Sequence, residues 1–576
     1  MSTKINGLCC ISYPSFQLLS KRGWSGKGEG SFLQYGSYKC FPYFYRVMRL
    51  CIWLLLAATV KGQDLTLARN AFINRDMNEA IDYWHISRPQ KNFHASFRPF
   101  LYASLTAASD SVVPFRFYGF KNAFLIQRLG VHPKNKTWTA LQYQPLAEVE
   151  AGWDGYSKRL LTSSSAGLQM RANFNDNVTV CGTARGGRAW LPYFLDTVVK
   201  YNKVLPGIGQ AYGSSRAGYA WSDFTGYVSW APNHSKVFNI QAGRDRHFIG
   251  DGYRSVLLSD YAPAYWYYRM SARFWRMQYS VWYSWLKDIE QAAGIKNNYR
   301  NKYGTFHYLS YNITDNFNVS VFENVVWRGT DTGQVRSFDV NYLSPVVFFR
   351  PIEYANGSSD NSFMGLNTSL ILFKQLKIYG QLGVDEFNLK YIRARNGWWA
   401  NKQAWQLGAK YINAFGWKGF RLQVEYNQVR PYTYSHGLVD QNYGHNGLPL
   451  AHPYGANFKE LLGIAGFRRE KFEISWQGGL VVMGRDSSAS SNVGQNIFMS
   501  YSTRGQEFGN YTGQGLKTTV LQNQLRVAWH VLPLLGARIE AGYMLRAEQG
   551  EKGFTLHAPY VYVGFRTAIF SETRDF

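Results

Sequence analysis

Phe420-Arg-Leu-Gln-Val-Glu-Tyr-Asn427 alternates apolar and polar side chains along its whole length. In an extended strand, successive side chains point to opposite faces. Phe420, Leu422, Val424 and Tyr426 would therefore share one face, and Arg421, Gln423, Glu425 and Asn427 would share the other. The stretch predicts a β-strand with one apolar and one strongly polar side.

The same alternation recurs along the chain, in residues 405–411, 471–477, 525–530 and 537–545. A single such strand would also suit a soluble sandwich. The pattern repeats over several hundred residues, however, with aromatic residues at strand ends and charges on the polar face. Lipid requires a closed sheet, and a water-filled interior tolerates charge. We therefore predict an all-β protein, a transmembrane antiparallel β-barrel of the outer-membrane type, over residues 136–576.

Composition supports this fold class. The 576 residues include 41 Tyr and 38 Phe, and aromatic and charged residues each make up 17%, whereas soluble proteins carry about 25% charged residues. The formal net charge of +26 favours an anionic partner such as nucleic acid, lipopolysaccharide phosphate or acidic polysaccharide. A solvated basic surface is the alternative. We expect no nucleic acid, because the polar faces mix acid with base and the chain carries an export signal.

That signal is the run Leu50–Val60, which follows the basic Arg46-Val-Met-Arg49 and precedes Lys61-Gly62. Eleven mostly apolar residues are too few for a spanning helix and typical of a secretory signal peptide. We expect a signal peptide at 48–62, cleaved after Gly62, with a buried helix as the alternative. Residues 1–47 are then an over-annotated start or a leader extension. Beyond this region Cys181 is the single cysteine, so an internal disulfide is not expected.

The two ends of the mature chain carry further signals. Residues 64–84 space their apolar side chains as a helix does. We predict a small N-terminal helical element on the periplasmic side, a cap or plug beside the barrel, within a segment 63–135 that leads into the barrel. A soluble helical appendage is the alternative. The final amphipathic run 560–570 and the terminal Phe576 are typical of barrels inserted by the barrel assembly machinery.

The most distinctive motif is Gly243-Arg-Asp-Arg-His-Phe-Ile-Gly-Asp-Gly-Tyr-Arg-Ser-Val-Leu-Leu-Ser-Asp260. Its glycines permit positive φ, so the loop can turn sharply inwards. It lacks the Lys-Ser/Thr of a phosphate loop. Arginine and histidine side chains could present donors to an anionic or hydroxyl-rich ligand, although a purely structural turn is the alternative. The candidate ligand contacts are Arg244, Arg246, His247, Asp251, Tyr253 and Arg254.

A second motif begins at Arg430-Pro-Tyr-Thr-Tyr-Ser-His436 and continues through Asn442-Tyr-Gly-His445 to residues 448–458. Tyrosine, histidine and asparagine clustered in a long loop suit sugar recognition by stacking and hydroxyl hydrogen bonds. A well-packed extracellular loop would use the same residues. The candidates here are Arg430, Tyr432, Tyr434, His436 and His445.

Catalytic motifs are sparse. The sequence contains neither HExxH nor Gly-x-Ser-x-Gly, and no paired carboxylates stand out. We expect no enzymatic activity, no cofactor and no metal site.

On these two motifs the chain resembles the Wzi-type capsule-assembly proteins, in particular the Bacteroidetes relatives described as gliding-motility RemB-like. The matching stretches are Gly250–Ala262 and Arg430–Ser435, with Leu448–Phe458 closest to the Bacteroidetes branch. The resemblance implies a monomeric barrel of about 18 strands with a small periplasmic helical element. It also implies a non-enzymatic role in binding and assembling, or anchoring, capsular polysaccharide at the outer membrane. Two other functions stay open, a gliding-motility or adhesion component and a diffusion porin.

Overall fold

The computed structural model describes residues 70, 73–101, 125–131, 138–174, 177–232, 237–289, 299–331, 334–335, 342, 360–532, 537–567 and 574–575. All described residues belong to one compact unit, Ala57–Phe576. The predicted signal peptide at 48–62, residues 1–47, Phe570 and Phe576 lie outside the described residues.

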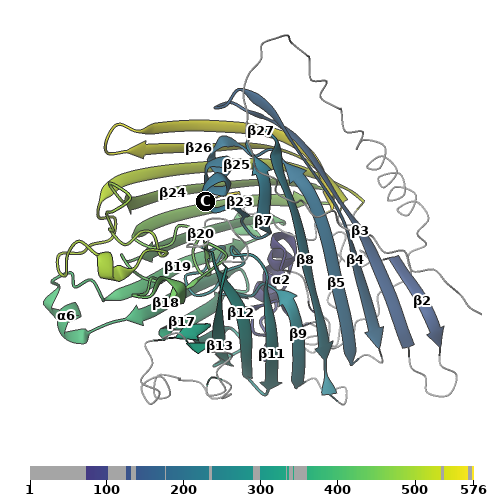
Figure 1. Cartoon of the computed structure of the whole chain (residues 1–576). Helices are drawn as coiled ribbons and strands as arrows, with labels where there is room; N and C mark the ends of the chain where they lie inside the picture. The colour runs from purple at the N-terminus through teal and green to yellow at the C-terminus, as the bar shows by residue number, and fades with distance from the viewer. Residues whose placement is uncertain are drawn as a thin grey trace, which may run out of the picture. The chain divides into compact units, whose positions relative to one another are not determined.

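The predicted antiparallel barrel is confirmed, with 18 strands in a closed ring (Figure 1). Each strand pairs antiparallel with the next. Around the ring, the strands are β3 (Trp138–Asp154), β4 (Arg159–Phe174), β5 (Val178–Ala189), β8 (Gly218–Trp230), β9 (Phe238–Asp245), β11 (Tyr265–Phe274), β12 (Met277–Asp288), β13 (Arg300–Asn312), β14 (Phe317–Arg328), β17 (Asn361–Leu372), β18 (Leu376–Glu386), β19 (Lys402–Ile412), β20 (Phe420–Val429), β23 (Phe458–Arg469), β24 (Phe472–Arg485), β25 (Leu516–Leu532), β26 (Ala537–Gly550) and β27 (Thr555–Thr567).

The ring closes where β27 pairs with β3, in a register from Tyr560 opposite Asp154 to Arg566 opposite Glu148. The earlier half of β3, Trp138 to Tyr143, pairs instead with β2 (Leu125–Val131). Closure satisfies the backbone hydrogen bonds of both edge strands, as a lipid environment requires.

The two ends of the barrel differ in their connections. At one end, here called the turn end, strands are joined by short turns such as residues 275–276, 373–375 and 470–471. At the other, the loop end, residues 155–158 and 551–554 form short turns, but the other connections are much longer and include residues 190–217, 246–264, 430–457 and 486–515. Short turns on the periplasmic side and long loops outside are typical of bacterial outer-membrane barrels.

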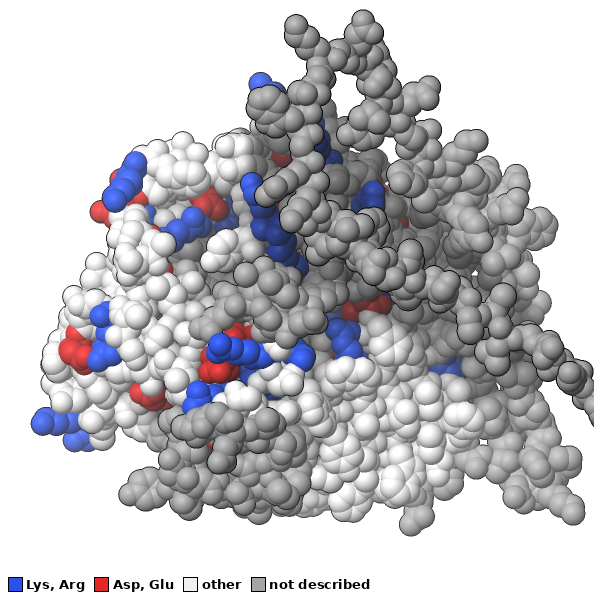
Figure 2. All heavy atoms as spheres, in the orientation of Figure 1, with Lys and Arg blue, Asp and Glu red and all other residues white. Residues whose placement is uncertain are grey.

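The outer wall is apolar, as the alternation predicts. Trp476, Leu525, Tyr543, Val561 and Trp153 are direct neighbours across five consecutive strands and are all exposed. Between them along the strands, polar side chains such as Glu473 and Glu540 point inwards and are buried. Figure 2 shows the outer face over β9 and β11 almost without Lys, Arg, Asp or Glu. Such a surface suits the hydrocarbon of a bilayer.

Exposed aromatic side chains gather at the turn end. Trp275, Phe373, Phe415 and Trp417 lie in the turns themselves and are between 64% and 87% exposed. Aromatic girdles of this kind mark the membrane–water interface of barrels. These exposed aromatic residues indicate that the turn end lies at one surface of a membrane.

The remaining described elements are short. They are α2 (Arg75–Ser87), β1 (Phe97–Arg98), α4 (Tyr193–Asn202), β6 (Val204–Leu205), β7 (Gly209–Ser214), β10 (Phe248–Ile249), β15 (Thr330–Asp331), β16 (Gln334–Val335), α6 (Leu389–Ala394), η5 (Ala414–Gly416), η6 (Val439–Gln441), β21 (Gly444–His445), β22 (Leu448–Pro449) and η7 (Tyr501–Thr503). In the described part of the chain, no helix is both long and apolar enough to cross a membrane.

The predicted N-terminal helix forms, but over different residues. It begins at Arg75, capped by the Asn74 side chain, whereas the apolar spacing predicted a start at residue 64. Asn70 lies instead in a β-bridge with Leu101. The helix also lies within the ring of strands and not beside it (Figure 1). The spacing of apolar residues could not predict this location. The helix lies inside because its charged side chains pair with polar side chains on the inward faces of the strands.

Candidate functional site

The first motif folds into the barrel. After β9, residues 246–264, here the inward loop, turn away from the loop end, and their strand β10 pairs with β1 beside α2. Gly250 has a φ of +140°, and a Cβ there would collide with the Gln381 side chain. The predicted inward fold of this loop is thus observed, and a glycine is required at its turn.

Charged side chains of the wall fasten the inward loop. The backbone N–H groups of Tyr253 and Arg254 donate to the Glu425 carboxylate at 2.8 and 3.0 Å. Asp251 pairs with Lys377 and accepts from Asn367 at 3.1 Å. Burial by itself would raise the pKa of Asp251, but the Lys377 charge and hydrogen bonds hold it below its usual value. Asp251 therefore stays ionised inside the barrel.

The second motif covers the inward loop from above. The hydroxyls of Tyr434 and Tyr443 donate to the carbonyls of Val256 and Leu257 at 2.7 and 2.9 Å. The Ser259 N–H donates to the Leu450 carbonyl at 2.8 Å. The structure therefore brings the two predicted motifs together, as one packed plug across the lumen. The packing is tight, because the side chains of residues 256–258 are fully buried.

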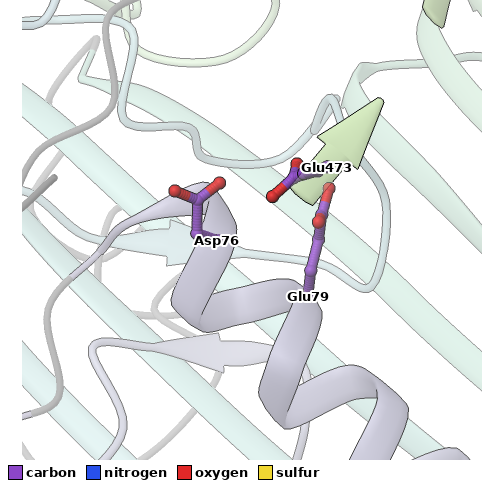
Figure 3. Close-up of side chains that lie close together, drawn as sticks. All are labelled: Asp76, Glu79 and Glu473. Carbon is purple, nitrogen blue, oxygen red and sulfur yellow. The ribbon is translucent and has the colours of Figure 1, made fainter. Parts of the chain in front are cut away.

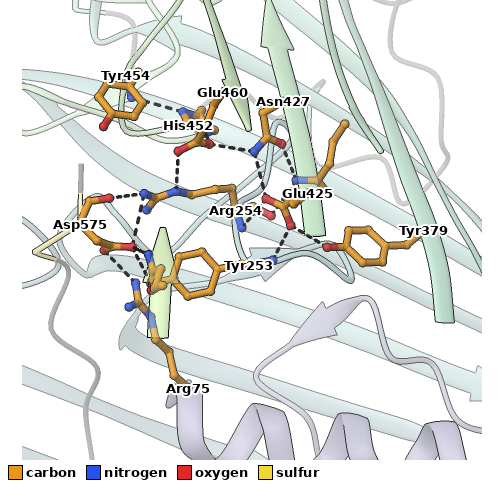
Figure 4. A network of polar contacts seen from close by, with 12 residues as sticks. Arg75, Tyr253, Arg254, Tyr379, Glu425, Asn427, His452, Tyr454, Glu460 and Asp575 are labelled. Atoms are coloured by element: carbon orange, nitrogen blue, oxygen red, sulfur yellow. Dashed lines mark hydrogen bonds and ion pairs between the residues drawn. The ribbon is translucent and has the colours of Figure 1, made fainter. Parts of the chain in front are cut away.

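The C-terminal tail joins this plug. Figure 4 shows Asp575 beside Arg254, Tyr253 and Arg75. Its carboxylate lies 3.4 Å from Arg254 and 3.3 Å from Arg75, and it accepts from the Tyr253 hydroxyl at 2.5 Å. Arg254 also lies 3.6 Å from Glu460. We call these residues, with Glu425, the plug network. It links α2, the inward loop, two strands and the tail.

A second cluster of charges ties α2 to the wall. Asp76, Glu79 and Glu473 bring carboxylate oxygens within 4.8 Å of one another (Figure 3). Three guanidinium groups neutralise them: Arg421 lies 2.6 Å from Glu79, Arg526 lies 2.6 Å from Glu473, and Arg538 pairs with Asp76. With cations already in place, the cluster is an ion-pair anchor for the helix and gives no support for a metal centre.

The predicted contacts of the first motif mostly bind the protein itself. Arg244 pairs with Asp223 at 3.4 Å and is partly exposed. Arg246 donates to the Gly207 carbonyl at 2.5 Å. His247 is fully buried, stacks on Trp282 and lies 3.2 Å from the Tyr265 hydroxyl. Arg244 lies on wall strand β9, whereas Arg246, His247, Asp251, Tyr253 and Arg254 belong to the inward loop and build the plug. The role of all six as ligand contacts stays a prediction.

The predicted contacts of the second motif are also largely internal. Arg430 donates to the Asn401 carbonyl at 2.8 Å. Tyr432 and Tyr434 adopt left-handed backbone conformations and are buried. His436 and His445 accept backbone N–H groups of Leu438 and Lys287. Burial lowers the pKa of His436 to about 4 and that of His445 to about 3. Both are therefore neutral near pH 7 and offer no positive charge to an anion.

Among the described residues, a cavity at the loop end is large enough to take a ligand. Its volume is about 550 Å³, within the range of small-molecule sites, about 300–1,000 Å³. Helix α4, residues 447–455 and 495–498, and the loop ends of β24, β26 and β27 surround it. Tyr201 and Phe554 stand at its rim, 79% and 51% exposed. The cavity therefore opens to solvent.

The lining of the cavity combines aromatic rings with amide and charged side chains. Aromatic rings come from Tyr193, Tyr201, Phe498 and Phe554, and amide groups come from Gln495 and Asn496. Arg485 and Arg546 both pair with Glu548, at 2.9 and 2.7 Å. Of this lining, sequence reasoning singled out only residues 448–458 and, within the stretch Gly250–Ala262, Tyr261. The rest carries no local motif, since it comes from strand ends and a helix far apart in the chain.

Comparisons with known proteins show the fold. No family model matches the sequence, and no curated protein matches it either. Among solved structures, the chain is similar to Wzi of Escherichia coli, described as an outer-membrane protein involved in group 1 capsule assembly and a carbohydrate-binding β-barrel. The TM-score is 0.56 at 11% identity, over 88% of this chain and 100% of that one.

Two further barrels match less closely. OprD of Pseudomonas aeruginosa gives a TM-score of 0.41 at 11% identity, over 74% of this chain and 93% of that one. OccAB1 of Acinetobacter baumannii gives 0.41 at 9% identity, over 74% and 96%. The fold of this chain is thus similar to that of the Wzi barrel.

Proposed function

We propose that this protein is a non-enzymatic barrel of the bacterial outer membrane that binds surface polysaccharide at its loop end and helps to assemble or anchor it there. The observation that carries the proposal is the open cavity of about 550 Å³ lined by aromatic rings, amides and arginines. Rings stack on the apolar faces of sugars, and amides and guanidinium groups bond their hydroxyls. The carbohydrate binding described for the similar Wzi barrel supports the same function.

Membrane location follows from the wall. A closed ring of strands with an apolar outer face and an aromatic girdle satisfies every demand of a bilayer. The partners that this proposal includes are outer-membrane lipid and lipopolysaccharide, the barrel assembly machinery during insertion, and surface polysaccharide. We propose that the protein acts as a monomer, since the ring closes within one chain and needs no second copy to complete it.

The plug argues against a diffusion porin. The inward loop, α2 and the tail contact inward side chains of the wall, and residues 430–457 cover the inward loop. Val256, Leu257 and Leu258 are fully buried there. A water-filled channel would expose such side chains. We expect the purified barrel to be electrically silent in planar bilayers, and steady open-channel conductance would favour the porin function.

The direct test is calorimetric binding of the detergent-solubilised barrel to surface polysaccharide from its own organism. We expect saturable binding, and we expect the double variant Tyr201→Ala and Phe554→Ala to bind about tenfold more weakly, a loss of about 1.4 kcal/mol. The matched control is Tyr511→Ala, which removes an exposed tyrosine that does not line the cavity. Unchanged affinity in the double variant would move the binding site elsewhere.

Failure of all polysaccharide fractions to bind would overturn the proposal. A deletion strain with normal surface polysaccharide but impaired spreading would instead support a gliding-motility or adhesion component.

A further inference from the structure

The charges of the loop-end cavity are few and unequal. Among the described residues that line it, Arg485, Arg546 and Glu548 are the ionisable groups that carry charge near pH 7. Two guanidinium groups thus face one carboxylate, which leaves a positive excess. A neutral sugar alone would not require this excess.

The two arginines occupy different positions around Glu548. Arg546 donates through Nε to Oε1 at 2.7 Å and is nearly buried, with a side chain 10% exposed. Arg485 donates through one terminal nitrogen to Oε2 at 2.9 Å and has a side chain 42% exposed. Arg546 therefore neutralises Glu548 from inside. Arg485 is held in place by the same carboxylate but reaches into solvent.

Arg485 can bind a second carboxylate without leaving Glu548. A guanidinium group carries five N–H donors in a planar fork, and carboxylates meet such a fork with two parallel hydrogen bonds. One donor of Arg485 is engaged by Glu548. The other edge of the group is available to a ligand in the cavity.

Resting on the proposed function, we infer that the cavity selects sugars that bear a carboxylate, such as uronic acids. The sugar carboxylate pairs with Arg485. Gln495 Nε2 donates to the Tyr454 carbonyl and Asn496 Oδ1 accepts from the Phe498 N–H, so these two amides offer their other polar atom to ring hydroxyls. Tyr201 and Phe554 at the rim stack on sugar faces. Without the predicted leader and signal peptide of residues 1–62, the sequence still carries a net charge of about +19, which draws such an acidic polymer towards it.

The test compares one polysaccharide in two forms. The surface polysaccharide of the organism is titrated into the folded barrel before and after its carboxylates are chemically reduced to hydroxyls. We expect the native form to bind at least about tenfold more tightly, in line with a charge-assisted hydrogen bond. Arg485→Gln and Arg485→Ala should remove this preference, while Lys390→Ala, which removes the same charge from exposed α6, should keep it.

The outcomes separate the two proposals. Equal binding of both forms, unaffected at Arg485, overturns the carboxylate inference and leaves polysaccharide binding standing. No binding of either form overturns the proposed function and the inference with it. Heat-modified migration in gels reports whether each variant is folded, and Arg485→Gln keeps a donor for Glu548 if Arg485→Ala does not fold.

Discussion

The plug network and the loop-end cavity use the same residue types in opposite ways. In the plug, the side chains of Arg254, Glu460 and Asp575 are at most 5% exposed, and every charge faces another. In the cavity, Arg485 pairs with Glu548 but keeps 42% of its side chain exposed. Burying an arginine between carboxylates makes it part of the structure. Leaving one edge in water makes it available to a ligand.

The plug network and the cavity should also differ in how much their ion pairs contribute to the free energy of folding. Removing one partner of a buried ion pair leaves a charge without compensation inside the protein, whereas an exposed pair is screened by water. The plug network should therefore contribute to stability and hardly to binding. The charged side chains of the cavity should contribute to ligand binding and little to stability. Each of the following predictions tests one side of this contrast.

The largest effect is expected for Arg254→Ala. It leaves the buried carboxylates of Glu460 and Asp575 without their shared cation. We expect the free energy of unfolding to fall by about 3–5 kcal/mol, measured by urea titration of the barrel in detergent. A change below about 1 kcal/mol would show that the plug network is not the structural element that its burial indicates.

The next effect concerns the wall that surrounds both regions. Val424→Arg places a charge on the exposed apolar face of β20 and should cost about 2–4 kcal/mol near the bilayer midplane. Val424→Leu is the matched control and should be nearly neutral. The measurement is unfolding in lipid vesicles. A cost as small for arginine as for leucine would contradict the inward and outward assignment on which the comparison rests.

The plug should also be sensitive to acid. Burial by itself raises the pKa of Asp575, but the charges of Arg254 and Arg75 lower it well below its usual range. In Asp82, the charges of Lys410 and Lys377 likewise outweigh burial. Both carboxylates therefore contribute stability that is fully present above the unfolded pKa of about 3.9 and is lost as pH falls through the lower folded value.

We expect the melting temperature to fall as pH is lowered from 5 to 2, a window that begins above that unfolded value of about 3.9. Asp575→Asn should be less stable at neutral pH and should lose less on acidification. Glu79 should have the opposite effect on the pH dependence of stability. Burial raises its pKa, although the charge of Arg421 opposes this rise. A pH profile identical in Asp575→Asn and the parent protein would remove Asp575 from the network.

The smallest effect on stability is expected for Arg485→Ala. Its pair with Glu548 is partly exposed, and Arg546 still neutralises the same carboxylate. We expect a loss of less than about 1 kcal/mol in the same urea titration as Arg254→Ala. A loss as large as that of Arg254→Ala would erase the contrast between the two regions.

Sequence reasoning predicted that this loop folds inwards and that its charges contact a ligand, but it could not show which buried side chains of the protein those charges also meet. Arg254 and Asp575 lie 321 positions apart, and Tyr253 binds Glu425 from a strand 172 positions away. Nothing in residues 243–260 indicates that these partners exist. An arginine-rich loop looks the same in sequence whether its donors face water or buried carboxylates.

The cavity was missed for a related reason. Tyr193 and Tyr201 lie on α4, Arg485 ends β24, and Arg546 and Glu548 lie on β26. Each is unremarkable in its own segment. A signal existed only in residues 448–458 and in Tyr261 of the first motif's stretch, which line the cavity in part.

The sequence by itself determined the strands, their inward and outward faces and the closed barrel. These depend on a period of two residues and on the hydrogen-bonding needs of a backbone in lipid, both of which can be read locally. Only the tertiary structure decided where α2 lies, which charges neutralise one another and which arginine stays open to solvent. Coulomb energies and burial depend on distances in space, and barrel closure sets those distances between residues hundreds of positions apart.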